Sequence, residues 1–160
     1  MATSLGSASS FWYHAYNGSA VKINRGQTVE FTLAAQVIET VEINKVPIIQ
    51  TTVTPGLKFA GVAMSDIPVA TIGAVAFMGP VMALVDNTVL AGEQVGMDFA
   101  LDVLTDIVAS AAPAIGAAYS TITVSPAVGV ALEAGPASGN ALRLIFLWPI
   151  SALYVGNGGV

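Results

Sequence analysis

Three long stretches of this sequence carry no charged side chain, and each is interrupted by proline and glycine: Ile67–Val85, Ile107–Leu132 and Leu144–Val160. By length alone each approaches the roughly 20 residues that a membrane-spanning helix needs. A helix in lipid must satisfy its backbone groups internally, and breakers at this density oppose that. No lysine or arginine cluster flanks the stretches, so the positive-inside signal is missing too. We therefore expect no membrane contact.

The apolar excess must then be covered by protein. Hydrophobic residues make up 54% of the 160 residues and charged residues only 9%, against about 25% charged in an ordinary domain. One domain of this size cannot hide so much apolar surface in its own core. What stays outside predicts contacts with copies of the same chain or with other chains.

Nucleic-acid binding and enzyme chemistry are both disfavoured. The net charge is −5 and the five basic residues are scattered, so the electrostatic driving force for nucleic acid is absent. His14 is the only histidine and the chain has no cysteine; no nucleophile elbow or phosphate-binding loop accompanies them. We expect no enzyme, no catalytic residue, no cofactor and no small-molecule substrate.

Alternation of residue types predicts a mainly β fold. Val29, Phe31 and Leu33 alternate with polar residues, which is typical of a strand. Short β-prone runs punctuated by Pro, Gly, Asn and Asp follow at residues 37–49, 59–64, 75–78, 81–85 and 94–97. This spacing indicates a small antiparallel β-barrel or sandwich-like (β-tulip-like) domain.

One short helix is expected near residues 98–110. Asp98, Asp102 and Asp106 recur at i, i+4 and i+8 beside two apolar rows, which indicates one polar helix face. Three carboxylates are also the ligand type of calcium and magnesium. The spacing of an EF-hand is missing, however, so we assign no metal site, and whether the three aspartates bind a cation stays open.

The domain division expected is an extended N-terminal arm over 1–19, a β domain over 20–149 and a C-terminal tail over 150–160. Aromatic residues gather in the arm and after the last expected strand, and aromatic side chains are efficient interface anchors. The expected interface residues are Phe11, Trp12, Tyr13, Tyr16, Trp148 and Tyr154. The alternative is that they only cap the core of the barrel.

An internal repeat pairs residues 59–80 with residues 127–149. Gly61-Val-Ala63 matches Gly129-Val-Ala131, and Pro68 matches Pro136. With one residue inserted in the second copy, Val75 aligns with Leu144. Each copy then contains a strand, a turn and a strand that ends in proline, which predicts two similar hairpins, placed as opposite sides of one barrel.

The same segments carry a family resemblance. Val128–Ala134, the Gly/Pro turn after it and the apolar strand to Pro149 resemble tailed-phage capsid decoration (cement) proteins. In that family a similar earlier segment, here Phe59–Pro80, precedes a Gly-acid-x-Val element. Ala91-Gly-Glu-Gln-Val95 fits this element, and Arg25-Gly-Gln-Thr-Val29 resembles an earlier version of it. The likeness covers roughly Ala20–Pro149.

The resemblance implies a structural virion protein on the outer capsid surface of a tailed bacteriophage. Such a protein stabilises an icosahedral shell by binding seams of the major capsid protein as a homotrimer. The alternative is another self-assembling subunit, such as a tail, fibre-base or surface-layer-type protein. The apolar excess suits both hypotheses equally, and only the motif likeness favours decoration.

Overall fold

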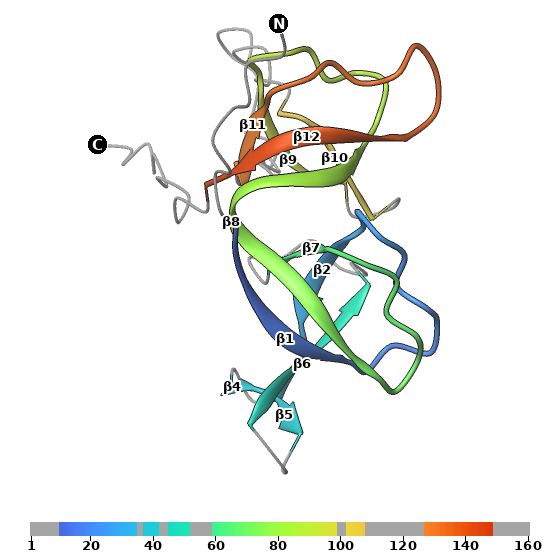
Figure 1. Ribbon diagram of the computed structural model, residues 1–160, viewed down its shortest axis with the longest axis vertical. Coiled ribbons are helices and arrows are strands. Elements are labelled where there is room, and N and C mark those ends of the chain that lie inside the picture. The colour runs from blue at the N-terminus through green and yellow to red at the C-terminus, as the bar shows by residue number, and fades with distance from the viewer. Residues whose placement is uncertain are drawn as a thin grey trace, which may run out of the picture.

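Short β-branched and aromatic runs separated by turn residues form strands throughout the part of the chain that the structure describes. This computed structural model describes residues 10–34, 37–41, 45–51, 59–98, 102–107 and 127–148. Within these ranges every regular element is a strand and none is a helix (Figure 1). The mainly β fold expected from the sequence is confirmed.

The strands, in chain order, are β1 (Phe11–Asn17), β2 (Thr28–Phe31), β3 (Leu33–Ala34), β4 (Val37–Ile38), β5 (Thr40–Val41), β6 (Val46–Thr51), β7 (Phe59–Ala63), β8 (Ile72–Val85), β9 (Gln94–Asp98), β10 (Val103–Asp106), β11 (Gly129–Ala131) and β12 (Ala141–Leu147).

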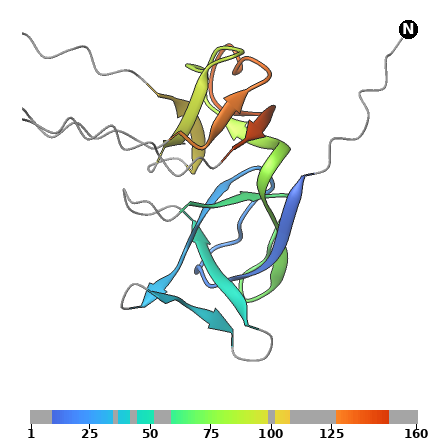
Figure 2. The same ribbon diagram turned by 90° about the vertical axis from the view of Figure 1, so that its left-hand side faces the viewer.

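The strand pairings close two small barrels. The first ring runs β1-β6-β2-β7-β8 and returns from β8 to β1. The second runs β8-β10-β9-β11-β12 and returns from β12 to β8. Figures 1 and 2 show them as two lobes, the first with β1 and β6 and the second with β11 and β12. Closure leaves neither ring with an open edge.

Strand β8 belongs to both barrels. Its first half pairs with β1 and β7, and its second half pairs with β12 and β10. The sequence suggested two short strands here, at 75–78 and 81–85, because Gly79-Pro80 looked like a break. Instead the strand continues through Gly79, whose φ of 90° is open to glycine without steric cost. The chain thereby passes from one barrel into the next (Figure 1).

The second barrel repeats the topology of the first. The second half of β8 takes the place of β1, and β9, β10, β11 and β12 take the places of β2, β6, β7 and β8. Even the exceptional parallel pairs correspond, because β1 runs parallel to β6 as β8 runs parallel to β10. Val29 lies opposite Gly61 as Val95 lies opposite Gly129. The chain is therefore a tandem of two equivalent barrels that share one strand.

This register corrects the sequence alignment of the two hairpins. Ala63 pairs with Val75, and its counterpart Ala131 pairs with Ile145. Val75 therefore corresponds to Ile145, one residue beyond the Leu144 that the sequence matched to it. Both Val75 and Ile145 are fully buried, and a slip of one residue would turn them outward. The two hairpins also lie in two different barrels, not on opposite sides of one.

Each barrel has its own apolar core. The core of the first is lined by Ala15, Ile23, Val29, Ile49, Ala60, Ala63, Ile67 and Val75. The core of the second includes Val85, Val95, Met97, Leu104, Val128, Ala131, Ile145 and Leu147. Val62 and Ala76, although on strands of the first barrel, pack with this second cluster. The two barrels are thus joined by packing as well as by the shared strand.

The expected helix near 98–110 is wrong over the residues that the structure describes. Asp98 ends β9, Val103–Asp106 form β10, and the two strands pair antiparallel. Asp102 has a left-handed φ of 55°, which no right-handed helix accommodates. Val103 and Leu104 are both buried, so packing against the barrel outweighs a weak helical pattern. Residues 99–101 and 108–110 lie outside the described residues.

Part of the expected N-terminal arm is a strand of the sheet. Phe11–Asn17 pair with β8 from Phe11↔Met78 to Tyr16↔Ile72, and also with β6. β1 therefore closes the first barrel. Strands β3, β4 and β5 come between β2 and β6 in the sequence, and the described residues between β9 and β10 contain no counterpart of them. Residues 150–160, expected as a tail, lie outside the described residues.

Candidate interaction surface

The start of β1 and the end of β12 meet on neighbouring residues of β8. Phe11, the first residue of β1, pairs with Met78, and Leu147, the last residue of β12, pairs with Gly79. Trp148 follows Leu147 in the chain. Phe11 is 61% exposed, Trp12 51% and Trp148 58%, and Met78 is exposed as well. We call Phe11, Trp12, Met78 and Trp148 the waist surface, because they lie where the chain passes from one barrel to the other.

The exposed aromatic side chains of the waist surface rest on other rings. The ring of Phe11 lies 6.3 Å from that of Phe77, centroid to centroid. The ring of Trp148 lies 6.2 Å from that of Phe146. Trp12 contacts His14 edge-on at 5.1 Å. Such contacts hold the rings in place while leaving apolar area outward, which is what an interface anchor requires.

Two other predicted interface residues lie differently. The Tyr13 hydroxyl donates a hydrogen bond to the Ala60 carbonyl oxygen at 2.8 Å, and its ring stacks on Phe31. Burial raises the pKa of Tyr13 above its ordinary value. Tyr13 therefore packs against the core of the first barrel. Tyr16 is half-buried in β1. Tyr154 lies outside the described residues.

An apolar pocket of about 530 Å³ opens beside Tyr13 at one end of the first barrel. Its walls are formed by Tyr13, Phe31, Ile38, Thr40, Lys45, Pro47, Phe59, Ala60 and Phe77. Among the described residues of this wall, Lys45 is the one charged side chain. The pocket therefore suits an apolar side chain.

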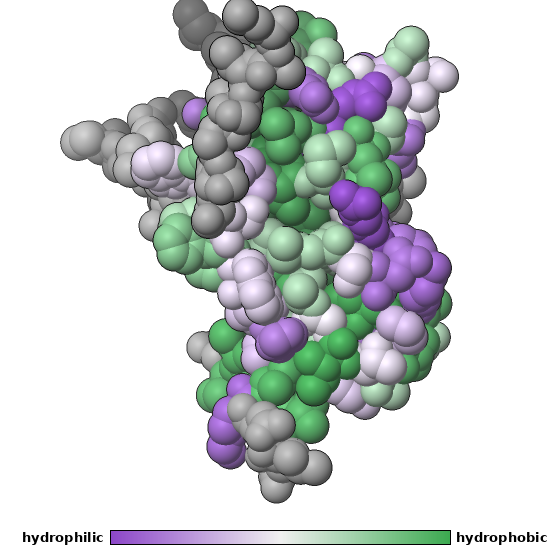
Figure 3. Space-filling view, in the orientation of Figure 1, coloured by the Kyte–Doolittle hydropathy of each residue, from purple (hydrophilic) through white to green (hydrophobic). Residues whose placement is uncertain are grey.

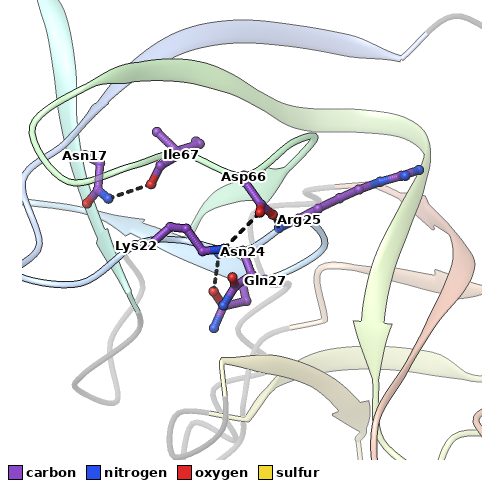
Figure 4. Close-up of polar contacts among 7 residues, drawn as sticks. All are labelled: Asn17, Lys22, Asn24, Arg25, Gln27, Asp66 and Ile67. Carbon is purple, nitrogen blue, oxygen red and sulfur yellow. Dashed lines mark hydrogen bonds and ion pairs between the residues drawn. The ribbon is translucent and has the colours of Figure 1, made fainter.

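The two barrels carry the same turn before their second strand (Figure 4 shows the first). In the first turn, the Asn24 backbone amide donates to Gln27 Oε1 at 2.5 Å. The Gly26 amide donates to the Ala63 carbonyl at 2.8 Å. In the second, the Leu90 amide donates to Glu93 Oε2 at 2.8 Å. The amide of Gly92 then donates to the carbonyl of Ala131 at 2.7 Å.

The first turn also carries an ion pair. Asp66 accepts hydrogen bonds from the Arg25 amide and from Lys22 Nζ, both at 2.9 Å (Figure 4). These bonds, that of Arg25 first, hold the pKa of Asp66 below its ordinary value. The pair is solvent-exposed, so it contributes little to stability and fixes the local shape of the turn instead.

Apolar residues are exposed on both barrels. Figure 3 shows hydrophobic residues in wide patches on each lobe, with hydrophilic residues gathered mainly toward the right-hand side of the view. Exposed apolar residues outside the waist surface include Val21, Val37, Val69, Ile72, Leu90 and Leu132. An exposed apolar area of this extent is typical of protein contact surfaces.

The strand register separates Asp106 from the other two aspartates singled out in the sequence. Asp106 Oδ1 accepts a hydrogen bond from Thr88 Oγ1 at 2.5 Å, and Asp98 and Asp102 lie at the other end of the same hairpin. Across the described ranges no three His, Cys, Asp or Glu residues gather as metal ligands would. Nor does any helix there have the length and hydropathy to cross a membrane.

Sequence reasoning missed a second apolar surface, on the second barrel, formed around Gln94, Val130 and Phe146. The signal for it was present. The two barrels have equivalent turns of similar sequence, each running into the strand that follows it: Arg25-Gly-Gln-Thr-Val29 and Ala91-Gly-Glu-Gln-Val95. Gln94 is therefore the counterpart of Thr28. The sequence showed their likeness but not that they occupy the same place in two barrels.

The described residues form two β-barrels with aromatic side chains exposed on their surface. No family model matches the chain, and no curated protein matches it. Among solved structures it is similar to the N base of the head fiber gp8.5 of bacteriophage phi29. That likeness has a TM-score of 0.51 at 9% sequence identity and covers 86% of this chain and 94% of that chain. At this identity the likeness is one of fold.

Proposed function

We propose that this protein is a structural component of a phage virion that binds the outer surface of an icosahedral capsid as a homotrimer. The observation that carries the proposal is the fold shared with a head-fiber base over most of both chains. The motif resemblance to capsid decoration proteins comes from the sequence and is independent of that comparison.

The proposed mechanism is adhesive. The waist surface presents Phe11 and Trp12 outward, and burying apolar area contributes about 25 cal/mol per Å² before the entropic costs of association. Repeated over the seams between major capsid proteins, such contacts would resist outward pressure on the shell. This mode of action requires no catalytic group, cofactor or nucleic acid.

A second candidate, a fibre-base subunit, is favoured by one observation. The similar solved structure is the base of a fiber, and a base must hold a further protein segment as well as the shell. In this role the protein would hold that further segment, whereas a decoration subunit would hold the shell alone. Capture of a further virion protein by capsids loaded with this chain distinguishes the two roles.

The experiment is to add the purified protein to capsids that lack it and to measure co-sedimentation and heat resistance. We expect saturable binding and shells that open at a higher temperature. The double variant Phe11→Ser/Trp12→Ser should bind more weakly, while Val21→Ser/Val69→Ser, which removes exposed apolar side chains elsewhere, should bind like the parent protein. Absence of binding by the parent protein would overturn the proposal.

A further inference from the structure

One face of the first barrel is covered by the second barrel. The Leu84 amide donates to the Gly26 carbonyl at 2.8 Å, and the Thr28 amide donates to the Asp102 carbonyl at 3.1 Å. Thr28 is fully buried. Val62, paired with Thr28, packs with the core of the second barrel. This face is an interface between two barrels within one chain.

The second barrel has the same face, formed by counterpart residues. Thr28 pairs with Val62, which pairs with Ala76. Gln94 pairs with Val130, which pairs with Phe146, in the same order of strands. Together with Gly92, the counterpart of Gly26, these residues make what we call the second face: Gly92, Gln94, Val130 and Phe146.

No residue that the structure describes covers the second face. A Cβ placed on Gly92 would meet nothing within 4 Å, and Gln94 is exposed. A hollow of about 260 Å³ lies on it, lined by Gln94, Ala127, Gly129, Val130, Phe146 and Trp148. None of these lining residues is charged, so the hollow suits an apolar protein surface.

We propose that the second face is the contact surface for a second copy of this chain. Its counterpart on the first barrel is already covered by a barrel of the same topology, so a barrel is the kind of partner to which this face is shaped. The inference rests on the self-association proposed above and names its surface. A trimer has no twofold axis, so the face would meet a different patch of the neighbouring copy, and such a contact closes into a ring.

The first test is the mass of the protein in solution, measured by light scattering. The parent protein should be a trimer, and Gln94→Arg or Val130→Arg should shift the mass toward that of a monomer while the circular dichroism spectrum stays unchanged. The control Val21→Arg, exposed on the first barrel, should remain a trimer. Variants at Gln94 and Val130 that stay trimeric would overturn the inference and leave self-association intact.

A second test identifies what covers the face. Because the chain has no cysteine, the variant Gln94→Cys carries a single thiol whose rate of reaction with a maleimide reports access to the face. We expect at least a tenfold slower reaction in the trimer than in the monomer obtained by dilution. A thiol equally protected in the monomer would show that the chain covers its own face, and a thiol equally reactive in both states would show that it stays open; either result overturns the inference. A parent protein that is monomeric throughout removes the trimer as well, and capsid binding then decides the proposed function separately.

Discussion

Gly26 and Gly92 occupy the same position in two copies of one turn, but only Gly26 is enclosed. Their φ angles are 85° and 89°. A Cβ on Gly26 would lie 2.3 Å from Leu142 Cδ2 and 3.1 Å from the Leu84 amide nitrogen, whereas one on Gly92 would meet nothing within 4 Å. Substitution of Gly92 therefore measures the free-energy cost of a side chain at positive φ alone. Substitution of Gly26 measures the same cost together with that of overpacking the contact between the barrels.

Alanine at the two positions should have unequal effects. Gly92→Ala should lower the free energy of unfolding by about 1 kcal/mol, because alanine is strained at positive φ. Gly26→Ala should add about 1–3 kcal/mol to that loss, because the methyl group overpacks the joint between the barrels. Urea unfolding of the diluted, monomeric protein measures both losses, because Gly92 lies on the face proposed to contact a second copy. Equal losses of unfolding free energy in the two variants would contradict the packing of Gly26 against the second barrel.

A buried asparagine closes the first barrel at the end of β1. Asn17 Nδ2 donates to the carbonyls of Val21 and Ile67, each at 3.0 Å, and Asn17 Oδ1 accepts from the Ser19 amide at 2.9 Å. Asn17→Ala should cost about 1–3 kcal/mol, because it removes three hydrogen bonds from the end of the barrel and takes the acceptor away from the Ser19 amide. The carbonyls of Ile67 and Val21 keep their bonds from the Ile23 amide and the Ser19 hydroxyl.

The charged variant Asn17→Asp should destabilise the protein at neutral pH at least as much as alanine does, because a carboxylate cannot donate to those carbonyls. Thermal melting of the two Asn17 variants tests whether Asn17 stabilises the first barrel through these hydrogen bonds. Ser19→Ala, whose side chain is more accessible, is measured beside them. A melting temperature of Asn17→Asp equal to that of the parent protein would contradict it.

Asp86 should make stability fall in acid. Burial pushes the pKa of Asp86 upward, but hydrogen bonds from Thr88 and Thr105 outweigh it and bring the pKa below the ordinary value of 3.8. A carboxyl with a lowered folded-state pKa stabilises the fold above its unfolded-state pKa, and this stability is lost as the pH falls through the folded-state pKa.

Asp86→Asn keeps an oxygen to accept the bond from the Thr88 amide but no longer titrates. Its unfolding free energy should therefore vary less between neutral pH and pH values below about 4 than that of the parent protein. Urea titrations across this range check the prediction. Identical pH profiles for the parent protein and Asp86→Asn would refute the role of Asp86, and Asp66→Asn serves as an exposed comparison.

Adjacent aromatic residues in β1 should separate stability from association. Trp12→Ser should change the unfolding free energy by less than about 1 kcal/mol, since surface substitutions seldom cost more, but should weaken binding to capsids. Tyr13→Phe should cost about 1 kcal/mol, because it removes the hydrogen bond to Ala60, and should leave capsid binding unchanged. The reverse pattern would argue against the waist surface.

The sequence reveals the class of fold because its signals are local. Alternation at Val29 and Phe31 and the Gly-Val-Ala triplets around Val62 and Val130 mark strands that the structure contains. The two-barrel arrangement is not predictable in this way, because it depends on β8 pairing with β1 along one half and with β12 along the other. No short sequence pattern records such long-range pairing.

The error at 98–110 has the same origin. Spacing of the aspartates mimics a helix face, but the decisive contacts of Leu104 are with Met97 and Val85 across strands. Among the interface predictions, Phe11, Trp12 and Trp148 lie on the surface and Tyr13 lines the first barrel. Composition alone cannot distinguish the two, because it does not show which way a strand residue faces.

Electron cryo-microscopy of capsids incubated with the purified protein tests the central claim most directly. The account predicts two-lobed density on the outer shell, three copies around each occupied site, with the waist surface or the second face turned toward a neighbouring chain. Particles whose outer surface is identical with and without the protein, at concentrations well above those that support the trimer, would contradict it.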